Sequence, residues 1–381
     1  MAVAVAPVHF PVFAPTLPDP AELHDVIVSV FASGRVTVGP QVAALEEEVG
    51  ARLGVRHVIG VSCGTNALLL LLRALNLPAG GEVITPTFTF AATAQALLWH
   101  GLTPVFCDSD PDTFTMDAAA ADALITEKTV AIYPVNIFGV AGDLDAYQAL
   151  ADRHGLPLLF DSAQGIGSTY KGRAVGTFGA GEAFSMSPTK VVTALEGGLI
   201  TTNDDELAYQ LRYMRDYGKA EDGEDMRWLG LSARMSEINA AVARWSFARL
   251  DTWIANRTAI MERYLARLGE MPGLSTQQIP ADRTSSRNYI VILLDPDRAP
   301  ITRDELYRKL KDEGVQTKRY FYPALHNQTL FRDVEPGCAA RLPVAARIAD
   351  TALALPMYSH MTLDTVDEIC DIVESCCMAY A

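Results

Sequence analysis

HVIGVSCGTNALLLLLRALN, residues 57–76, decides the fold class of this chain. Its first part is an apolar run of strand length, and the leucine-rich part from Asn66 onward is typical of a buried helix. The same order returns in the stretches that follow: GEVITP (81–86), AATAQALLWH (91–100), PVFCD (104–108), TVAIYPVN (129–136), DLDAYQALADRHG (143–155) and PLLFDSA (157–163). Strands that alternate with helices predict an α/β domain with a mostly parallel sheet, and strands that are apolar throughout indicate helices on both faces.

The pattern changes after Asp204. A helix with an acidic first turn is predicted over 204–218, and 236–268 indicates one long helix, or two with a bend, that begins at a serine N-cap. A strand (288–295) and two further helices (302–314 and 362–376) follow. We therefore expect a large domain over residues 1–250 and a smaller C-terminal α+β domain over residues 251–381.

Composition excludes several classes of function. The 381 residues carry a net charge of -15, which argues against a nucleic-acid partner or an anionic membrane surface. The six cysteines form no CxxC pair and the seven histidines show no HExxH spacing, so we expect no disulfide, no metal site and a cytoplasmic location. The apolar N-terminal stretch lacks the basic start of a signal peptide, and no apolar run reaches the roughly 18 residues of a membrane span.

Two strand ends carry candidate binding groups. In SCGTNALLL, Gly64 and Thr65 open a helix directly after a strand, and free amides at a helix start bind phosphate. The alternative is a plain strand-to-helix turn. In LLFDSAQG, Asp161 follows four apolar residues, and a carboxylate beside the core needs a partner. That partner is either a helix N-terminus or a cation such as a protonated pyridine nitrogen.

A lysine in a constrained loop supplies the third group. Lys190 follows AFSMSPT, and the loop is marked by Pro188 and by the Gly197-Gly198 pair. A lysine in a confined polar site can act as a Schiff-base nucleophile, whereas most lysines pair with a carboxylate. A phosphate cradle, a buried acid and a loop lysine are together the requirements of pyridoxal 5'-phosphate (PLP).

Over residues 20 to 377 the sequence resembles the DegT/DnrJ/EryC1/StrS sugar aminotransferases, which belong to the fold type I, aspartate-aminotransferase-like PLP enzymes. The stretches that carry the resemblance are SGRVTVGPQVAALEEEVGARLGV, SCGTNALLL, TPTFTFAATAQA, PVNIFGVAGDLD, DSAQGIGSTYKG, FSMSPTK, EGGLITTND, RMSEINAAVA and YPALHNQTLF. The resemblance implies a large PLP-binding domain with a mostly parallel seven-stranded sheet and a smaller C-terminal domain. It also implies a homodimer with a shared active site.

The resemblance also implies a role for individual residues. Lys190 corresponds to the lysine that forms the Schiff base and shuttles the proton, and Asp161 to the partner of the pyridine nitrogen. The other implied cofactor contacts are Gly64, Thr65 and Ser185 at the phosphate, Gln164 near the ring and its 3'-oxygen, Phe90 stacked on the ring, and Asn239 from the neighbouring subunit.

Departures from the family pattern bear on the substrate. Ser187 stands where members acting at C4 of the sugar often have His, and Pro188 to Lys190 differs from the Tyr-Pro-Gly-Lys of many members acting at C3. Ser232 begins SARMSE in place of NYRMSE, and Asn136 replaces a common His. We expect all these positions to handle substrate. Further candidate contacts, for which a surface or packing role is an equal alternative, are Lys219, Arg234 and His326.

The function implied is transfer of an amino group from L-glutamate or glutamine to a keto group of a nucleotide-linked deoxy-sugar, first of all a 4-keto-6-deoxyhexose. Pyridoxamine phosphate is the aminated form of the cofactor in such a cycle. Alternatives are a keto-cyclitol or another non-nucleotide keto-sugar as substrate, and a non-catalytic PLP-fold regulator. A nicotinamide oxidoreductase is disfavoured because no GxGxxG follows the first strand, and a PLP-dependent dehydratase is disfavoured because Lys190 is retained.

Overall fold

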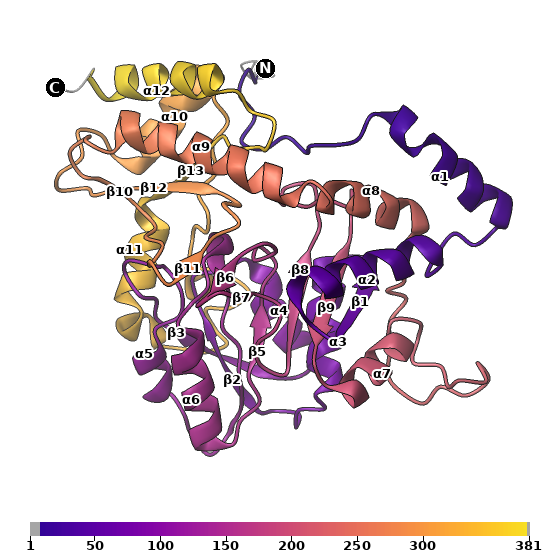
Figure 1. The fold of residues 1–381 in the computed structure, drawn as a ribbon. Helices are drawn as coiled ribbons and strands as arrows, with labels where there is room; N and C mark the ends of the chain where they lie inside the picture. Colours follow the sequence, from indigo (N-terminus) through magenta and orange to yellow (C-terminus); the bar gives the residue numbers. More distant parts are fainter. Residues whose placement is uncertain (1–7, 379–381) are drawn as a thin grey trace, which may run out of the picture.

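The computed structural model describes residues 8–378 of the chain, whose path is drawn in Figure 1. The first seven residues of the N-terminal stretch that we did not read as a signal peptide lie outside the described residues, so that reading stays a prediction. The helices are α1 (Pro20–Ser33), α2 (Pro40–Leu53), α3 (Gly64–Ala74), α4 (Ala91–Trp99), α5 (Ala118–Asp122), α6 (Leu144–His154), α7 (Asp205–Met214), α8 (Glu237–Phe247), α9 (Leu250–Leu268), α10 (Arg303–Asp312), α11 (Pro343–Thr351) and α12 (Leu363–Met378), with short 3-10 helices at Ile137–Gly139, Leu325–Asn327 and Cys338–Arg341.

The strands of the large part form two adjoining sheets, with the orders β1-β9-β8-β5 and β3-β2-β4. Their bounds are β1 (His57–Val61), β2 (Glu82–Pro86), β3 (Thr103–Cys107), β4 (Thr129–Ile132), β5 (Leu159–Asp161), β8 (Gly181–Ser185) and β9 (Gly198–Thr202). β2 is parallel to β3 and β4, and β5 is parallel to β8, whereas β9 is antiparallel to both of its neighbours. Isolated parallel bridges, Ile132 with Leu158 and Val135 with Asp161, connect the two sheets. The α/β fold is therefore present, while a continuous sheet of seven strands is not confirmed.

Helices cover both faces of these sheets. In β2, Val83 lies in the apolar cluster that contains residues of α3, α4 and α7, and its neighbour Ile84 lies in the cluster that contains residues of α2, α6 and α8. Successive side chains of a strand point to opposite faces, so both faces of β2 are buried. This burial explains why the strands are apolar at every position rather than at alternate ones.

Two helix boundaries test the sequence patterns directly. α6 ends where the glycine predicts, because Gly155 takes the left-handed φ of 63° that other residues rarely adopt. The stretch 236–268 forms two helices, with a break at Ala248 and Arg249. Ser236 is the N-cap residue of α8, but its side chain makes no capping hydrogen bond, in contrast to the expectation.

The C-terminal part has a small sheet and a core of its own. The antiparallel sheet has the order β10-β12-β13 and lies above the larger sheets in Figure 1. Side chains of this sheet and of α9, α10 and α12 form one apolar cluster. The bounds of these strands are β10 (Leu274–Thr276), β12 (Ile290–Leu294) and β13 (Ala352–Leu355). The N-terminal segment reaches this part as well, because Phe10 bridges Val315 and the Val12 N–H donates to Gln316 Oε1.

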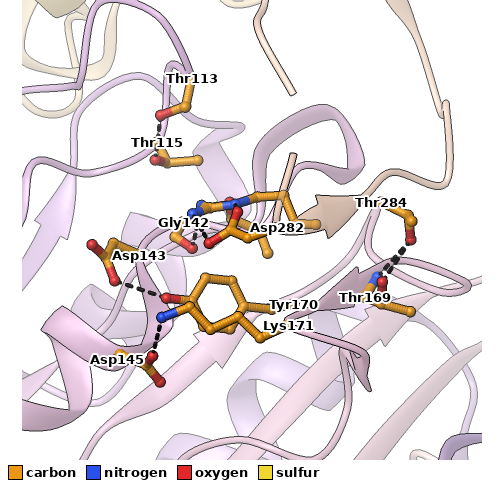
Figure 2. Close-up of polar contacts among 12 residues, drawn as sticks. Thr113, Thr115, Gly142, Asp143, Asp145, Thr169, Tyr170, Lys171, Asp282 and Thr284 are labelled. Atoms are coloured by element: carbon orange, nitrogen blue, oxygen red, sulfur yellow. Dashed lines mark hydrogen bonds and ion pairs between the residues drawn. The ribbon is translucent and has the colours of Figure 1, made fainter. Parts of the chain in front are cut away.

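A second contact ties the two parts together (Figure 2). β11 (Arg283–Thr284) pairs with β6 (Thr169–Tyr170), which in turn pairs with β7 (Arg173–Ala174). The hydroxyls of Thr169 and Thr284 lie 2.8 Å apart, and Arg283 donates to the Gly142 carbonyl at 2.7 Å. Because the N-terminal segment and β11 both cross between the parts, the domain boundary at residue 250 stays a prediction.

No helix within residues 8–378 is both long and apolar enough to cross a membrane. Across the same residues, no three His, Cys, Asp or Glu side chains gather in a way that would hold a metal ion.

Candidate active site

A cavity of about 330 Å³ opens where β1, β5 and β8 end. Its wall includes Tyr289, Tyr320 and Phe321 from the C-terminal part, so it lies between the two parts of the chain. The residues predicted from the sequence that line it are Gly64, Thr65, Phe90, Asp161, Gln164, Ser185, Ser187 and Lys190. Ligand sites in α/β sheets occur at the carboxyl ends of the strands, which is where these side chains converge.

The start of α3 forms a cradle on one side of the cavity. A Cβ on Gly64 would lie 2.7 Å from Ser185 Cβ, closer than such atoms approach, so only glycine fits between the helix start and β8. A Cβ on Gly198 would likewise lie 2.5 Å from the Cys63 carbonyl oxygen. The first amides of α3 and the Ser185 hydroxyl are therefore held close together. Free helix amides beside a hydroxyl are the donor set that a phosphate requires, so the cradle fits the phosphate of PLP.

Asp161 supplies a buried carboxylate to the cavity and is only 4% exposed. Its Oδ2 accepts from Thr93 Oγ1 at 2.7 Å, and its Oδ1 accepts from the Ala163 N–H at 3.0 Å. Burial raises the pKa of Asp161, while these two hydrogen bonds and the charge of Lys190 lower it. A carboxylate in this position stabilises a protonated ring nitrogen, which matches the second requirement of PLP.

Thr93 is a residue that the sequence analysis missed. It lies in the first turn of α4 and is fully buried, and its hydroxyl also lies 2.9 Å from that of Thr89. The available sequence signal was the spacing of Thr89 and Thr93, which are four residues apart across the start of α4, because that spacing lets their hydroxyls meet.

Lys190 lies in a tight turn and is half-buried. Its N–H donates to the Ser187 carbonyl at 3.0 Å, and its Nζ donates to Thr189 Oγ1 at 3.3 Å. Across residues 8–378, no carboxylate lies within ion-pair distance of Nζ, so the structural role that lysines usually have does not account for it. The Nζ lies 5.9 Å from the centroid of the Tyr289 ring.

Phe90 and Gln164 face the cavity from different elements. The Phe90 side chain is 61% exposed at the N-terminus of α4, where a planar ligand can stack on it. Gln164 accepts from the Phe138 N–H through Oε1 at 2.5 Å, so its Nε2 is the group left for a ligand. Phe321, whose ring lies 6.1 Å from that of Phe90, belongs to an aromatic wall that no sequence motif indicated.

Two of the substitutions noted in the sequence do not turn their side chains into the cavity of their own chain. Asn136 borders the cavity, but its Nδ2 donates to Ser162 Oγ at 2.8 Å and its Oδ1 accepts from the Gly142 N–H at 3.3 Å. Its carboxamide is therefore turned toward the core, contrary to the expectation that it handles substrate. Ser232 lies outside the cavity, where its backbone bridges that of Asp216.

The remaining candidates do not line the cavity of their own chain, although Asn239 bonds to Glu196, which does. His326 is buried with Nδ1 2.8 Å from Thr87 Oγ1, and burial lowers its pKa. Asn239 donates through Nδ2 to the Glu196 carbonyl at 2.6 Å. Arg234 and Lys219 line a separate depression, which Asp216, their shared ion-pair partner, also lines.

A family match, curated relatives and solved structures all point to the same family. Residues 19–374 match the DegT/DnrJ/EryC1/StrS aminotransferase family. The chain is 37% identical to the pleiotropic regulatory protein of Geobacillus stearothermophilus, over 89% of this chain and 90% of that protein. It is 34% identical to the dTDP-3-amino-3,4,6-trideoxy-alpha-D-glucose transaminase of Micromonospora megalomicea subsp. nigra, over 93% of this chain and 94% of that protein. Among solved structures, a DegT DnrJ EryC1 StrS aminotransferase from Brucella abortus superposes with a TM-score of 0.85 at 33% identity, covering 93% of this chain and 95% of that one.

Proposed function

This chain belongs to the DegT/DnrJ/EryC1/StrS family and is a PLP-dependent aminotransferase, and we propose that it aminates a keto group of a nucleotide-linked deoxy-sugar, with L-glutamate or glutamine as the amino donor. One observation carries the proposal. The cavity brings together the Gly64 cradle, the buried Asp161 carboxylate and a lysine, Lys190, that no carboxylate within residues 8–378 neutralises.

We assign the cofactor contacts as follows. The amides of Gly64 and Thr65 and the Ser185 hydroxyl would bind the phosphate, because all three residues line the cavity at the start of α3. Asp161 accepts from the protonated ring nitrogen, and Gln164 donates through Nε2 at the ring edge. The Phe90 ring covers one face of the cofactor.

Lys190 is the proton carrier in this proposal. When bound, PLP supplies an electron sink that stabilises negative charge on the substrate carbon. The Nζ of Lys190 takes the proton from Cα of the donor in the first half-reaction and delivers a proton to the former keto carbon of the sugar in the second. The turn that carries Lys190 fixes the position of the lysine backbone, and so the region that Nζ can reach.

The sugar is proposed to be a 4-keto-6-deoxyhexose, and Ser187 is its candidate contact. Ser187 lines the cavity, and its carbonyl accepts from the Lys190 N–H. The relative from Micromonospora megalomicea is named for a 3-amino sugar, so a 3-keto sugar is the substrate to test against the 4-keto sugar. A keto-cyclitol without a nucleotide is the alternative acceptor.

A second copy of the chain is proposed to complete the site. Asn239, Lys219 and Arg234 do not line the cavity of their own chain, and we assign them to the cavity of the partner in a homodimer. Tyr217, whose ring lies 5.6 Å from the Arg234 guanidinium, and Val36, whose chain neighbours line the depression, are exposed apolar side chains, as an unpaired interface would leave them. A cytoplasmic location remains part of the proposal on composition alone.

The test is spectroscopic and kinetic. Purified protein should show the visible absorbance of bound PLP and should lose it when glutamate is added. Lys190→Ala should lose both the absorbance and turnover, whereas the matched control Lys171→Ala, an exposed lysine paired with Asp145, should keep both. Full transaminase activity in Lys190→Ala would overturn the assignment.

A panel of acceptors then separates the substrates. It contains 4-keto and 3-keto nucleotide-linked 6-deoxyhexoses and a keto-cyclitol. Turnover of the cyclitol alone would favour the alternative substrate, and no absorbance change with either glutamate or glutamine would favour a regulatory role.

A further inference from the structure

A buried hydrogen bond joins the turn that carries Lys190 to the C-terminal part of the chain. The residue after the lysine, Val191, donates its N–H to Asn288 Oδ1 at 3.2 Å, and both residues are buried. The other end of this carboxamide, Asn288 Nδ2, is buried and finds no hydrogen-bond partner within residues 8–378. A buried donor without a partner lowers stability, so an apolar residue would be more favourable at position 288 if Asn288 Oδ1 had no role. The acceptor holds the backbone directly beside Lys190.

A buried guanidinium holds Asn288 in turn. Arg257 of α9 is 3% exposed and donates to the carbonyls of Asn288 at 3.0 Å and Arg287 at 3.3 Å, and to Ser359 Oγ at 2.9 Å. Burial lowers the pKa of Arg257 to about 10, and no carboxylate within residues 8–378 pairs with it. Burying a charge without a counterion is costly, so the backbone that Arg257 holds is strongly specified.

The backbone at this point is also strained. Arg287 adopts a φ of 55°, which residues other than glycine rarely take. Such a conformation persists when the surroundings enforce it, and the Arg257 hydrogen bonds to residues 287 and 288 do so. The result is a fixed direction for the Asn288 and Tyr289 side chains.

The Tyr289 ring meets Lys190 from the cavity side. Its centroid lies 5.9 Å from Lys190 Nζ and 5.1 Å from the centroid of the Tyr320 ring. Burial raises the pKa of Tyr320, and the neighbouring Tyr289 raises it further, so the Tyr320 hydroxyl stays neutral. Asn288 and Tyr289 therefore contact the lysine turn at its backbone and at its amine.

We propose that Asn288 and Tyr289 are positioning residues for Lys190, held in place by the buried guanidinium of Arg257. The proposal rests on the proposed function, in which Nζ moves the proton of the donor Cα. Proton transfer depends steeply on donor–acceptor geometry, and a displacement of about 1 Å can slow a reaction about 100-fold. Loss of the Val191 bond should therefore slow the proton step specifically rather than weaken substrate binding.

Single-turnover measurements with glutamate and Cα-deuterated glutamate test the proposal. Asn288→Ala should slow the loss of cofactor absorbance at least tenfold and enlarge the deuterium isotope effect, because proton transfer becomes more strongly rate-limiting. Ser359→Ala is the matched control, since it removes a different hydrogen bond of the same guanidinium. It should lower the unfolding temperature without changing the isotope effect. An Asn288→Ala rate within twofold of wild type, or an equal isotope change in Ser359→Ala, would overturn the proposal.

A second measurement does not depend on turnover. Hydrogen–deuterium exchange at the Val191 amide should be at least tenfold faster in Asn288→Ala than in wild type, and unchanged in Ser359→Ala. If wild type responds neither to glutamate nor to glutamine, the proposed function fails, while the exchange result still tests the Asn288 contact.

Tyr289→Leu covers the case in which Asn288→Ala does not fold. Loss of the ring should slow the proton step at least tenfold, whereas Tyr289→Phe, which keeps the ring, should stay within twofold. Equal rates in Tyr289→Leu and wild type would contradict the role of the ring.

Discussion

Thr93→Val should weaken PLP binding through Asp161 without reshaping the cavity. The Thr93 hydroxyl is fully buried and donates to Asp161 Oδ2 at 2.7 Å, while the carboxylate keeps its second bond from the Ala163 N–H. Valine has nearly the same shape as threonine and lacks only the hydroxyl. Removing that donor disfavours the ionised carboxylate that a protonated ring nitrogen needs as its partner.

The magnitude follows from the kind of bond that is lost. Hydrogen bonds to charged groups contribute about 1.5–3 kcal/mol, and about 1.4 kcal/mol corresponds to a tenfold change in an equilibrium constant. Because Asp161 is buried and water cannot replace the hydroxyl, we expect the dissociation constant of PLP to rise about 10- to 150-fold. The Asp161 pKa, which burial already raises, should rise further.

Equilibrium titration of the apoprotein with PLP, followed by absorbance, measures this change. Thr201→Val is the matched control: Thr201 is a buried threonine of β9 whose hydroxyl has no partner within residues 8–378. It should leave the dissociation constant unchanged and the fold equally or more stable. A Thr93→Val constant within twofold of wild type would refute the reasoning that Asp161 depends on this hydroxyl.

Other variants test the cradle, a buried acid and a helix start. Burial raises the pKa of Glu182 to about 7 from 4.5, so the folded state binds its proton more tightly than the unfolded state. Its ionisation should therefore lower the free energy of unfolding by about 3 kcal/mol as the pH rises from 4.5 to 7. In Glu182→Gln, the free energy of unfolding measured in urea should change less with pH across that range. The same change with pH as in wild type would contradict this. Gly64→Ala places a Cβ against Ser185, so we expect overpacking to lower the free energy of unfolding by about 1–3 kcal/mol in urea unfolding; unchanged stability would show that α3 and β8 can move apart. Glu237 accepts three backbone N–H bonds at the start of α2, so Glu237→Gln should cost about 2–3 kcal/mol of stability in urea unfolding, and a loss below about 0.5 kcal/mol would contradict that role.

Local sequence was sufficient to predict cavity residues that directly follow a strand. Gly64 and Asp161 were predicted from their positions at strand ends and Ser185 from the family resemblance, and all three line one cavity. The physical reason is that the strands of an α/β sheet end at a common edge, so residues far apart in sequence converge there without further information. Their roles toward the cofactor remain proposals, whereas the family is established.

Side-chain direction was beyond what the sequence determined. Asn136 lies at the cavity but turns its carboxamide to Ser162, and His326 is buried beside Thr87 and does not line the cavity. Both expectations rested on position in a motif. A motif specifies where a residue lies along the chain, and the hydrogen-bonding partners that fix its rotamer come from other elements.

By itself the sequence determined the α/β class, the family and the three groups that a PLP site requires, because each depends on local pattern or on matching stretches. Only the tertiary structure decided which distant residues support those groups. Thr93 reaches Asp161 across 68 positions of sequence, and Asn288 reaches Val191 across 97. Such contacts depend on how helices and sheets pack, and packing is set by the whole core rather than by any short stretch.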